Sequence, residues 1–364
     1  MIKRWVLASY FGKQYLYRFL AFLAALMGIV FLFEVAELMR RSGSKHEVPF
    51  NVILTMAAYK LPDTIEQILP FVVLFAGLLT FWKLTRTQEL IVARAAGVSA
   101  WQFAAPALLV TFLFGIINIT VLNSIGASLH GRYKELEIQY LDASPTFEFT
   151  GTGLWMRQSY QGNNYLIHAD KVKFSPLTLV PVVVFVYDEE GRYIKRIDAP
   201  EAQLIDSSWV VPNAIINFSN NTSEEAEEWD LPTNLTVSKI QDSMTDPNTI
   251  SVWELPKFIE TLEAIGLPTM RHEVAFHSIL AQPVALLAMA LFAVAFSLRL
   301  NRRGGVLPMI IAGVFIGSLA HFLNKLVLAL GMNNTLPIVL ATWAIPVIML
   351  ALGIAALLHI EESG

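Results

Sequence analysis

Residues 274–298 read VAFHSILAQPVALLAMALFAVAFSL, a run of 25 positions without Asp, Glu, Lys or Arg. A helix needs about 20 mostly apolar residues to cross the roughly 30 Å hydrocarbon core of a bilayer. The run is long enough, and the charged residues Glu273 and Arg299 bound it. It therefore predicts a transmembrane helix.

Outward from this run, the chain holds further intervals without acidic or basic residues. Three of them are long, at 95–131, 304–324 and 326–360, and two are shorter, at 19–33 and 67–82. The same length argument predicts one helix from each interval. The expected transmembrane helices span residues 15–38, 60–83, 101–123, 274–298, 305–329 and 336–358.

The composition excludes two broad classes of protein. Hydrophobic residues make up 55% of the chain, charged residues make up 15%, and the mean hydropathy is +0.52. A soluble domain carries about a quarter charged residues, so neither a soluble enzyme nor a disordered chain fits. The net charge of −4 gives no general attraction for nucleic acid. The absence of cysteine excludes disulfides, thiolate catalysis and Cys-ligated metal sites.

Charge is unevenly distributed along the chain. Residues 123–273 contain 22 acidic and 11 basic residues, whereas the other positions contain 8 acidic and 15 basic residues. The sequence therefore predicts a basic membrane part that carries an acidic, water-soluble insert.

The first apolar run has a competing interpretation as a cleavable signal peptide, because Lys3 and Arg4 precede it. A cleavage site needs small residues after the apolar run. Here Glu34, Glu37 and Arg40 follow instead, so we expect the first helix to be retained.

The short loops predict the orientation of the helices. Cytoplasmic loops are enriched in Lys and Arg, and basic residues gather before the first helix, between the second and third, and between the fourth and fifth. These places lie on one side of a six-helix arrangement, so both termini are expected in the cytoplasm and the insert outside. The residues concerned are Lys3, Arg4, Lys13, Arg18, Lys83, Arg86, Arg94, Arg299, Arg302 and Arg303.

The insert changes from helical periodicity to short β-branched and aromatic runs separated by turn residues. Asp188 to Gly191 predicts the turn of one hairpin. Glu224 to Glu228 is interpreted as a solvated loop rather than a metal site, and a helix around 252–264 followed by Gly266-Leu267-Pro268 leads back to the membrane. Many short strands favour an antiparallel sandwich or a partly open roll. The expected strands contain residues 153–157, 164–168, 182–187, 193–197 and 209–211.

Common catalytic motifs are missing from the sequence. It contains no P-loop for nucleotide phosphates, no HExxH zinc motif and no GxSxG nucleophile motif. Arg271-His272-Glu273 and His277 bring two histidines to helical spacing. Their place at a membrane entry favours an interfacial anchor over a metal site.

Charged residues near the outer ends of the helices leave two interpretations open. Glu37 lies three and four residues before Arg40 and Arg41, so ion pairs between them would neutralise interfacial charge. Alternatively, the charges line a cavity that receives an anionic amphiphile, because charge at membrane depth needs a partner or a wet cavity. Lys325 supports the cavity, although snorkelling to the interface would also explain it. The other residues concerned are Glu34, Lys60, Asp63 and Glu66.

The cavity interpretation predicts specific lipid contacts. Arg40, Arg41 and Lys325 would contact phosphate groups, since Arg suits bidentate contact and Lys acts as a point charge. Acyl chains would meet apolar residues, namely Phe31, Leu32, Phe75 and Phe322.

The segment between the second and third helices predicts a short cytoplasmic helix within residues 84–98. Leu90, Ala93 and Gly97 share one stripe, and the glycine ends the helix. A helix in this place can dock into a groove of a cytoplasmic partner and transmit rigid-body motion. The residues expected to act in this coupling are Glu89, Arg86, Leu90, Arg94 and Gly97.

The same segment resembles a known family. Arg86 to Val92 and Ala96-Gly97-Val98-Ser99 are similar to the coupling signature of the LptF/LptG family of lipopolysaccharide-export permeases. That signature runs from a glutamate to a glycine, an apolar residue and Ser or Thr. Tyr10-Phe11-Gly12-Lys13, Gln282-Pro283 and Arg302-Arg303-Gly304-Gly305 make the LptG branch the better match. The resemblance also includes Leu38 to Gly43 and Gly153-Leu154-Trp155.

The resemblance implies a specific transport complex. Two such permeases form a V-shaped cavity that takes lipopolysaccharide from the outer leaflet of the inner membrane. Two copies of the ATPase LptB bind beneath and use ATP, so the permease itself needs no cofactor. A periplasmic β-jellyroll passes the lipid to LptC and LptA. Glu89 matches the acidic coupling residue of the family and Arg40 and Arg41 match its basic residues, whereas Glu34 and Asp63 depart from the basic contacts of some relatives.

The expected organisation is therefore a helical membrane protein with an inserted all-β domain. Residues 1–129 hold three helices, 130–270 a periplasmic β-jellyroll-like domain and 271–364 three more helices. Two other classes stay open. A membrane receptor or sensor would normally add a cytoplasmic signalling domain, and only 359–364 follow the last expected helix. A secondary transporter would need buried carboxylates, which the cores of helices three to six lack.

Overall fold

The structure is a computed structural model that separates into two compact units. The helical unit comprises residues 1–136, 248–253 and 270–364, and the β unit comprises 137–247 and 254–269. The structure describes residues 2–43, 48–141, 147–150, 153–160, 162–174, 177–205, 208–220, 222–233, 246–264, 268–300, 306–333 and 335–362.

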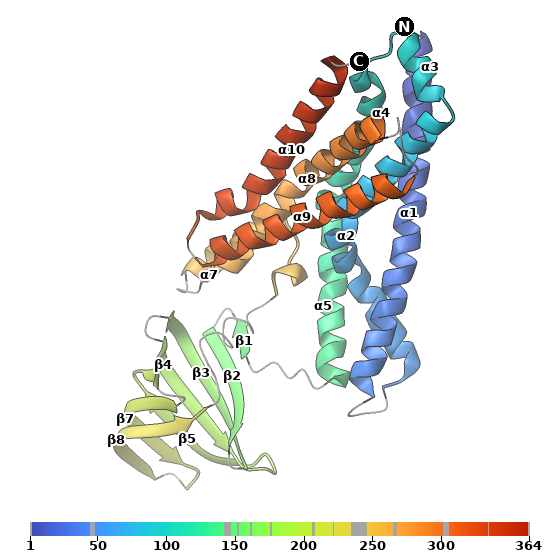
Figure 1. The fold of residues 1–364 in the computed structure, drawn as a ribbon. Helices are drawn as coiled ribbons and strands as arrows, with labels where there is room; N and C mark the ends of the chain where they lie inside the picture. The colour runs from blue at the N-terminus through green and yellow to red at the C-terminus, as the bar shows by residue number, and fades with distance from the viewer. Residues whose placement is uncertain are drawn as a thin grey trace. The chain divides into compact units, whose positions relative to one another are not determined.

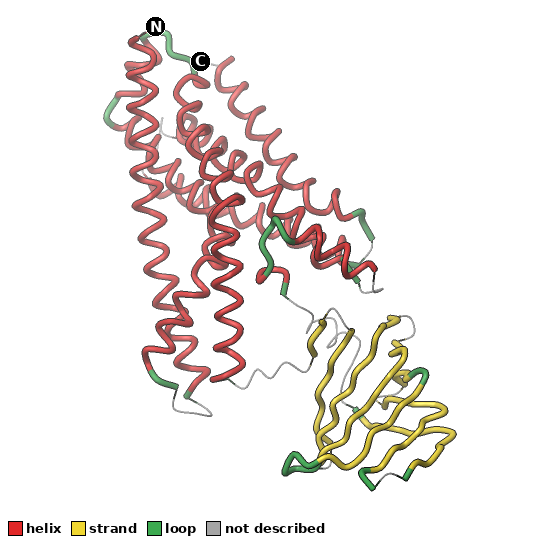
Figure 2. The backbone as a smooth tube through the Cα atoms, turned by 180° about the vertical axis from the view of Figure 1, so that it is seen from behind, coloured by secondary structure: helices red, strands yellow, loops and turns green. Residues whose placement is uncertain are grey.

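The helical unit is built from six helices that are long and apolar enough to cross a membrane, counted over the described residues. This confirms the expected fold class. The first two helices have 41 and 37 residues, which corresponds to about 60 Å and 55 Å of length. The helices are α1 (Ile2–Ser42), α2 (Phe50–Arg86), α4 (Ala100–Ile117) continuing through the π-helix η1 (Asn118–Leu122) into α5 (Asn123–Tyr140), α8 (Met270–Leu300), α9 (Val306–Met332) and α10 (Ile338–Glu362) (Figures 1 and 2).

Several helices extend well beyond their expected bounds, and the excess is largest in α1, α2 and α5. The uncharged runs mark only the part that must lie in hydrocarbon. A helix can continue into the headgroup region because charged side chains are tolerated there. The expected bounds were therefore too short.

Helix α8 lies at the centre of the helical unit, where it contacts α2, α4, α9 and α10. Leu286, Ala290 and Val294 are fully or almost fully buried in the shared core. The backbones of α2 and α8 approach closely at Gly77, where an added Cβ would lie 2.5 Å from the Cβ of Ala293. Small residues at such crossings are typical of helix packing in membranes.

A polar connection ties three helices together inside this unit. Pro70 has no N–H, so the carbonyl of Glu66 one turn earlier loses its helical donor. The side-chain amide of Gln282 donates to that carbonyl at 3.2 Å, and its oxygen accepts from the Asn118 amide at 2.7 Å. Asn118 begins the π-helix. This explains the Gln282-Pro283 motif structurally, because Gln282 joins α2, η1 and α8.

The β unit contains one antiparallel sheet of eight strands over the described residues (Figure 1). The strand order is β1-β2-β3-β4-β5-β7-β6, with β8 beside β7 and an additional β4–β6 pairing. Alternate residues such as Val182, Val184 and Val186 are buried in the core of this unit. The strands are β1 (Phe147–Thr150), β2 (Gly153–Tyr160), β3 (Asn163–Phe174), β4 (Leu177–Tyr187), β5 (Tyr193–Ala199), β6 (Ala202–Ile205), β7 (Ser208–Phe218) and β8 (Ser223–Pro232).

All five expected runs lie in strands, and the expected turn at Asp188 joins β4 to β5. Gly153 begins β2 with φ +121, and a Cβ there would collide with the carbonyl of Ala169. The helix expected around 252–264 is α7 (Leu255–Ala264), preceded by the short η2 (Pro247–Thr249). Gly266-Leu267 and Arg302-Arg303-Gly304-Gly305 lie outside the described residues.

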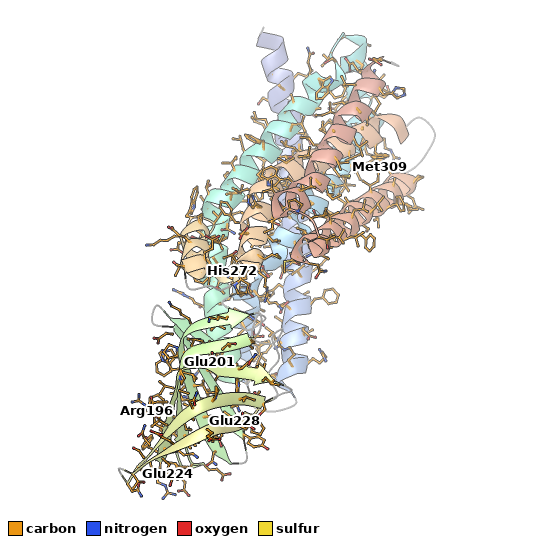
Figure 3. The ribbon with its side chains drawn as sticks, turned by 90° about the vertical axis from the view of Figure 1, so that its left-hand side faces the viewer. Arg196, Glu201, Glu224, Glu228, His272 and Met309 are labelled. Carbon is orange, nitrogen blue, oxygen red and sulfur yellow. The ribbon has the colours of Figure 1, made fainter. Side chains whose placement is uncertain are left out.

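The prediction of a solvated loop at Glu224 to Glu228 was wrong. These residues belong to β8, which pairs with β7 along its length. The glutamates are exposed (Figure 3), and charged side chains on an edge strand discourage pairing with other chains. An acidic run therefore indicates solvent exposure, which an edge strand provides as well as a loop does.

Candidate functional site

The expected coupling segment, residues 84–98, contains the end of helix α2 and a separate short helix, α3 (Glu89–Ala95). Helix α2 ends at Arg86, and the backbone N–H of Thr87 caps it by donating to the carbonyl of Lys83 at 2.9 Å. Gln88 adopts a left-handed conformation with φ 62, so the helix cannot continue. Helix α3 begins at the next residue.

Helix α3 presents two different apolar faces. Leu90 and Ala93 are 2% and 6% exposed and belong to the core of the helical unit. Ile91 and Val92 are 56% and 65% exposed. Leu90 and Ala93, from the expected stripe, therefore attach α3 to its own bundle, and the exposed apolar surface comes from two residues that the sequence did not single out. Leu90, Ile91, Val92 and Ala93 are consecutive apolar residues, so the sequence of this short helix has no pattern that separates the buried face from the exposed one.

Glu89, the first residue of α3, is half-buried and bonded within the chain. Its carboxylate accepts a hydrogen bond from the Thr87 hydroxyl at 2.8 Å, and the side chains of Glu89 and Tyr10 are also hydrogen-bonded. Tyr10 lies on α1. Glu89 therefore ties the start of α3 to both α2 and α1.

A short polar ladder extends this contact along α1. The Gln14 amide donates to the Tyr10 hydroxyl at 3.5 Å, and the Arg18 guanidinium donates to Gln14 at 3.4 Å. Arg18 also donates to the carbonyls of Leu79 and Thr80 on α2 at 3.0 and 3.3 Å. The spacing of four residues between Tyr10, Gln14 and Arg18 was the signal in the sequence that could have revealed this ladder.

The other expected coupling residues lie around α3. The Arg86 guanidinium packs over the Trp82 ring, 5.3 Å from its centre. Arg94 is half-buried in the last turn of α3, and Gly97 follows with φ +82. The structure thus brings Arg86, Glu89, Leu90, Arg94 and Gly97 into one short segment, and their role in coupling stays a prediction.

The expected lipid-contacting cations differ in how far they are already paired. Arg40 donates to both carboxylate oxygens of Glu37, at 2.8 and 2.7 Å, which confirms that expected pair. Arg41 donates to the Tyr133 hydroxyl at 3.4 Å. Lys325 on α9 is exposed and makes no hydrogen bond or ion pair with any residue that the structure describes.

Other charges at the same end of α1 and α2 pair between the two helices. Lys60 donates to Glu34 at 2.6 Å, and its ammonium group lies 5.6 Å from the centre of the Tyr133 ring. Glu34 therefore neutralises a lysine of this chain.

The apolar residues expected to meet acyl chains fall into two groups. Leu32 and Phe322 are 68% and 63% exposed, and Phe322 lies one turn from Lys325 on α9. Phe31 is half-buried. Phe75 packs beside Phe22, with ring centres 5.8 Å apart, so it is partly enclosed between α2 and α1.

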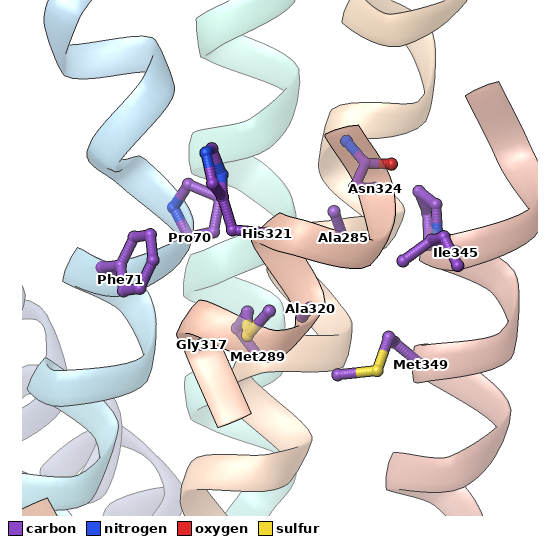
Figure 4. Close-up of a pocket in the computed structure, with 11 residues that line it drawn as sticks. Pro70, Phe71, Ala285, Met289, Gly317, Ala320, His321, Asn324, Ile345 and Met349 are labelled. Carbon is purple, nitrogen blue, oxygen red and sulfur yellow. The ribbon is translucent and has the colours of Figure 1, made fainter. Parts of the chain in front are cut away.

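A small pocket of about 80 Å³ lies between α2, α8, α9 and α10 (Figure 4). Pro70, Met289, Gly317 and Met349 contribute to its mostly apolar lining. His321 and Asn324 are the polar residues of the wall formed by α9, and the side-chain oxygen of Asn324 is buried without a hydrogen-bond donor among the residues that the structure describes.

Within the described residues, no group of three or more His, Asp or Glu side chains could hold a metal ion. His272 is buried, and Glu224 to Glu228 point into solvent along β8.

Comparisons with known proteins agree with this arrangement. A sequence profile of the family described as "Lipopolysaccharide export system permease LptF/LptG" matches residues 9–359. The chain is 23% identical over 331 residues to the lipopolysaccharide export system permease protein LptG of Haemophilus influenzae, covering 88% of this chain and 89% of the relative. It is 20% identical over 329 residues to LptG of Escherichia coli K12, with the same coverage. The chain belongs to the LptF/LptG family of lipopolysaccharide export system permeases.

Proposed function

We propose that this chain is a permease subunit of an ATP-binding-cassette transporter that extracts lipopolysaccharide from the inner membrane. It pairs with an LptF-like permease, and a dimer of the ATPase LptB binds the pair from the cytoplasm. The lipid then passes to the periplasmic β-jellyroll proteins LptC and LptA. The chain binds no cofactor of its own, because ATP is bound and hydrolysed by the partner.

The observation that carries this proposal is α3. A short helix whose inner face is anchored in the bundle, and whose outer face exposes Ile91 and Val92, is suited to a groove in a soluble partner. Its attachment to α1 through Glu89 and Tyr10 lets a push on α3 reach a transmembrane helix. Family membership supports a transport role for this movement.

The orientation that we propose places both termini and α3 in the cytoplasm and the β unit in the periplasm. The start of α1, α3 and the end of α10 lie at the same end of the helical unit (Figure 1). Together with the basic loops, this supports an even number of membrane crossings.

For the lipid, we propose that Arg40, Arg41 and Lys325 contact phosphates at the outer end of the helices. The exposed pair of Phe322 and Lys325 on α9 supports this, since it offers an apolar and a cationic group one turn apart. Phe31, Leu32 and Phe75 would contribute further acyl contacts.

For the β unit, we propose edge-to-edge pairing with a periplasmic β-protein. Among the described strands, β1 and β8 each pair with a single neighbour. The glutamates of β8 disfavour pairing there, so β1 is the better edge for a partner strand.

The test is purification of the full-length chain from membranes of its host cell, followed by reconstitution into proteoliposomes. An ATPase and a second permease should co-purify, and ATP should drive lipopolysaccharide to a soluble β-jellyroll acceptor. Co-purification of a signalling protein without an ATPase would indicate a receptor. Transport driven by an ion gradient alone would indicate a secondary transporter.

A further inference from the structure

The end of α10 is bonded to the beginning of α4, although the two lie 261 residues apart in the chain. The carboxylate of Glu361 accepts a hydrogen bond from the backbone N–H of Ala100 at 2.7 Å. Figure 1 shows the last turn of α10 beside the first turn of α4. Ala100 is the first residue of α4, and the short linker 96–99 separates it from α3.

This contact is more than an ordinary helix cap. The Ser99 hydroxyl already accepts from the N–H of Gln102 at 3.3 Å, and the Gln102 side chain accepts from the N–H of Ser99 at 3.4 Å. This capping box satisfies two backbone donors at the start of α4 locally. The N–H of Ala100 is a third backbone donor at the start of α4, and the carboxylate of Glu361, from a different helix, accepts its hydrogen bond. Negative charge at a helix N-terminus also interacts favourably with the helix dipole.

The linker between α3 and α4 is itself bonded to α3. The N–H of Gly97 donates to the carbonyl of Arg94 at 2.9 Å, and that of Val98 donates to the carbonyl of Ala93 at 3.1 Å. Helix α3, the linker and the first turn of α4 are therefore connected by consecutive hydrogen bonds. Displacement of α3 would move the N–H of Ala100 with it.

Through its bond to Ala100, Glu361 connects α3, the linker and the first turn of α4 to a part of the bundle that Glu89 does not contact. Glu89 and Tyr10 tie α3 to α1, whereas α10 packs against α8 and α9. The coupling segment is thus held at its start by one side of the bundle and at its end by another.

We propose that Glu361 is a positioning residue that transmits displacement of α3 to α10 and, through its packing, to α9. The proposal rests on the function proposed above, because it assumes that a partner ATPase moves α3. It adds a second route, at the opposite end of the coupling segment from Glu89.

The experiment uses the full-length chain in its complex with the second permease and the ATPase, reconstituted into proteoliposomes. ATP hydrolysis and the lipopolysaccharide delivered per ATP are measured together. Glu361→Ala removes the acceptor, and Glu361→Gln keeps an acceptor oxygen at the same reach. Glu362→Ala is the matched control, since Glu362 is the exposed next residue of the same helix.

Ala100→Pro removes the donor instead of the acceptor. Proline is well tolerated at the first position of a helix. Ser99, with φ −74 and ψ 161, already has the extended conformation that a residue before proline prefers. The variant therefore tests the same hydrogen bond from its other side.

We expect Glu361→Ala to leave complex assembly and ATP hydrolysis near wild type, while lipopolysaccharide delivered per ATP falls about tenfold, which corresponds to 1.4 kcal/mol. Glu361→Gln should recover most of the delivery, and Glu362→Ala should match wild type. Ala100→Pro should reproduce Glu361→Ala, and the double variant should be no worse than either single one. A residue that merely stabilised the fold would lower hydrolysis and delivery together.

Wild-type delivery per ATP in Glu361→Ala, or an equal loss in Glu362→Ala, would overturn the proposal. Additive losses in the double variant would overturn it as well. If Glu361→Ala does not assemble, Ala100→Pro decides the question, because wild-type delivery in that variant excludes the hydrogen bond as a route. Failure of the proposed function is distinguishable, because the wild-type complex would then deliver no lipopolysaccharide with ATP.

Discussion

The helical unit and the β unit use their polar side chains in different ways. In the helical unit, Gln282, Arg18 and Lys60 are partly buried and connect one helix to another. In the β unit, Arg196 pairs with Asp198 two residues away, and Arg192 pairs with Asp188 four residues away. A polar group in hydrocarbon needs a partner, whereas an exposed ion pair in water contributes little. Substitutions in the helical unit should therefore act at a distance, and those in the β unit should act locally.

The largest expected effect comes from removing the sheet of the β unit. Deleting residues 140–247 spares the segment whose Val252 N–H donates to Asn123 in the helical unit. We expect the shortened chain to insert into the membrane and retain its ATPase, while lipid transfer to a periplasmic acceptor is abolished. Co-purification and a transfer assay would measure this. Retained transfer would make the domain a lid or a brace, and loss of the ATPase would show that the units are not separable.

A charge on the exposed face of α3 should have the next largest effect. Val92→Asp would bury an unpaired carboxylate in the proposed ATPase interface, which costs several kcal/mol, and ATPase binding should fall at least a hundredfold. Val92→Ala loses only about 1–2 kcal/mol of apolar contact and serves as the milder comparison. Affinity of the purified permease pair for the ATPase is the measurement. Unchanged affinity in Val92→Asp would mean that this face does not meet the ATPase.

Glu89 offers a way to separate contacts within the chain from contacts with the partner. If Glu89 binds a basic residue of the ATPase, Glu89→Ala should cost about 1.5–3 kcal/mol of coupling. Tyr10→Phe and Thr87→Val remove its partners within the chain and leave the carboxylate in place, so their effects should be several-fold smaller. The measurement is lipopolysaccharide released per ATP hydrolysed. Equal losses in all three variants would place the role of Glu89 inside the permease, and wild-type coupling in Glu89→Ala would remove its role altogether.

The long uncharged runs were sufficient to predict the six helices, because desolvation of charge is the dominant cost in a bilayer. The faces of α3 could not be predicted in the same way. Leu90, Ile91, Val92 and Ala93 are all apolar, so the face that packs inward depends on the position of the rest of the bundle. The contact between Glu361 and Ala100 was equally hidden, since no local pattern relates residues 261 positions apart.

The β unit contains one strand segment whose conformation the sequence predicted and one whose conformation it did not predict. Val182 to Tyr187 was predictable as a strand because β-branched residues dominate it. Glu224 to Glu228 has no such residues, and it becomes a strand only because β7 supplies a complementary edge. Tertiary pairing decides the conformation of such a segment.

The lipid-contact residues should show a smaller, graded effect. Lys325 has no ion-pair partner within the described part of the chain, whereas Arg40 is held by Glu37. Photocrosslinkers at positions 40, 41 and 325 should all label lipopolysaccharide, with position 325 labelled most strongly. In addition, Glu37→Gln should raise the labelling of lipopolysaccharide by a crosslinker at position 41 about two- to threefold. The reason is that the Glu37 carboxylate competes with phosphate for Arg40, so its removal lets Arg40 hold phosphate beside position 41. Labelling of phospholipid or protein alone would identify these charges as interfacial anchors.

The smallest expected effect lies in the β4–β5 turn. Hydrogen bonds from the Arg192 backbone N–H and side chain lower the pKa of Asp188 below its ordinary value. A carboxyl group with a lowered pKa stabilises the fold at pH values above the ordinary value of about 4, and this contribution is lost as the pH falls through the lowered pKa. Hydrogen exchange of residues 187–193 in the full-length protein should therefore be faster in Asp188→Ala than in wild type at pH 6, with a smaller difference near pH 3. Glu189→Ala, in the same turn, should match wild type at both pH values, and faster exchange beyond this hairpin in Asp188→Ala would contradict the local character of charge in the β unit.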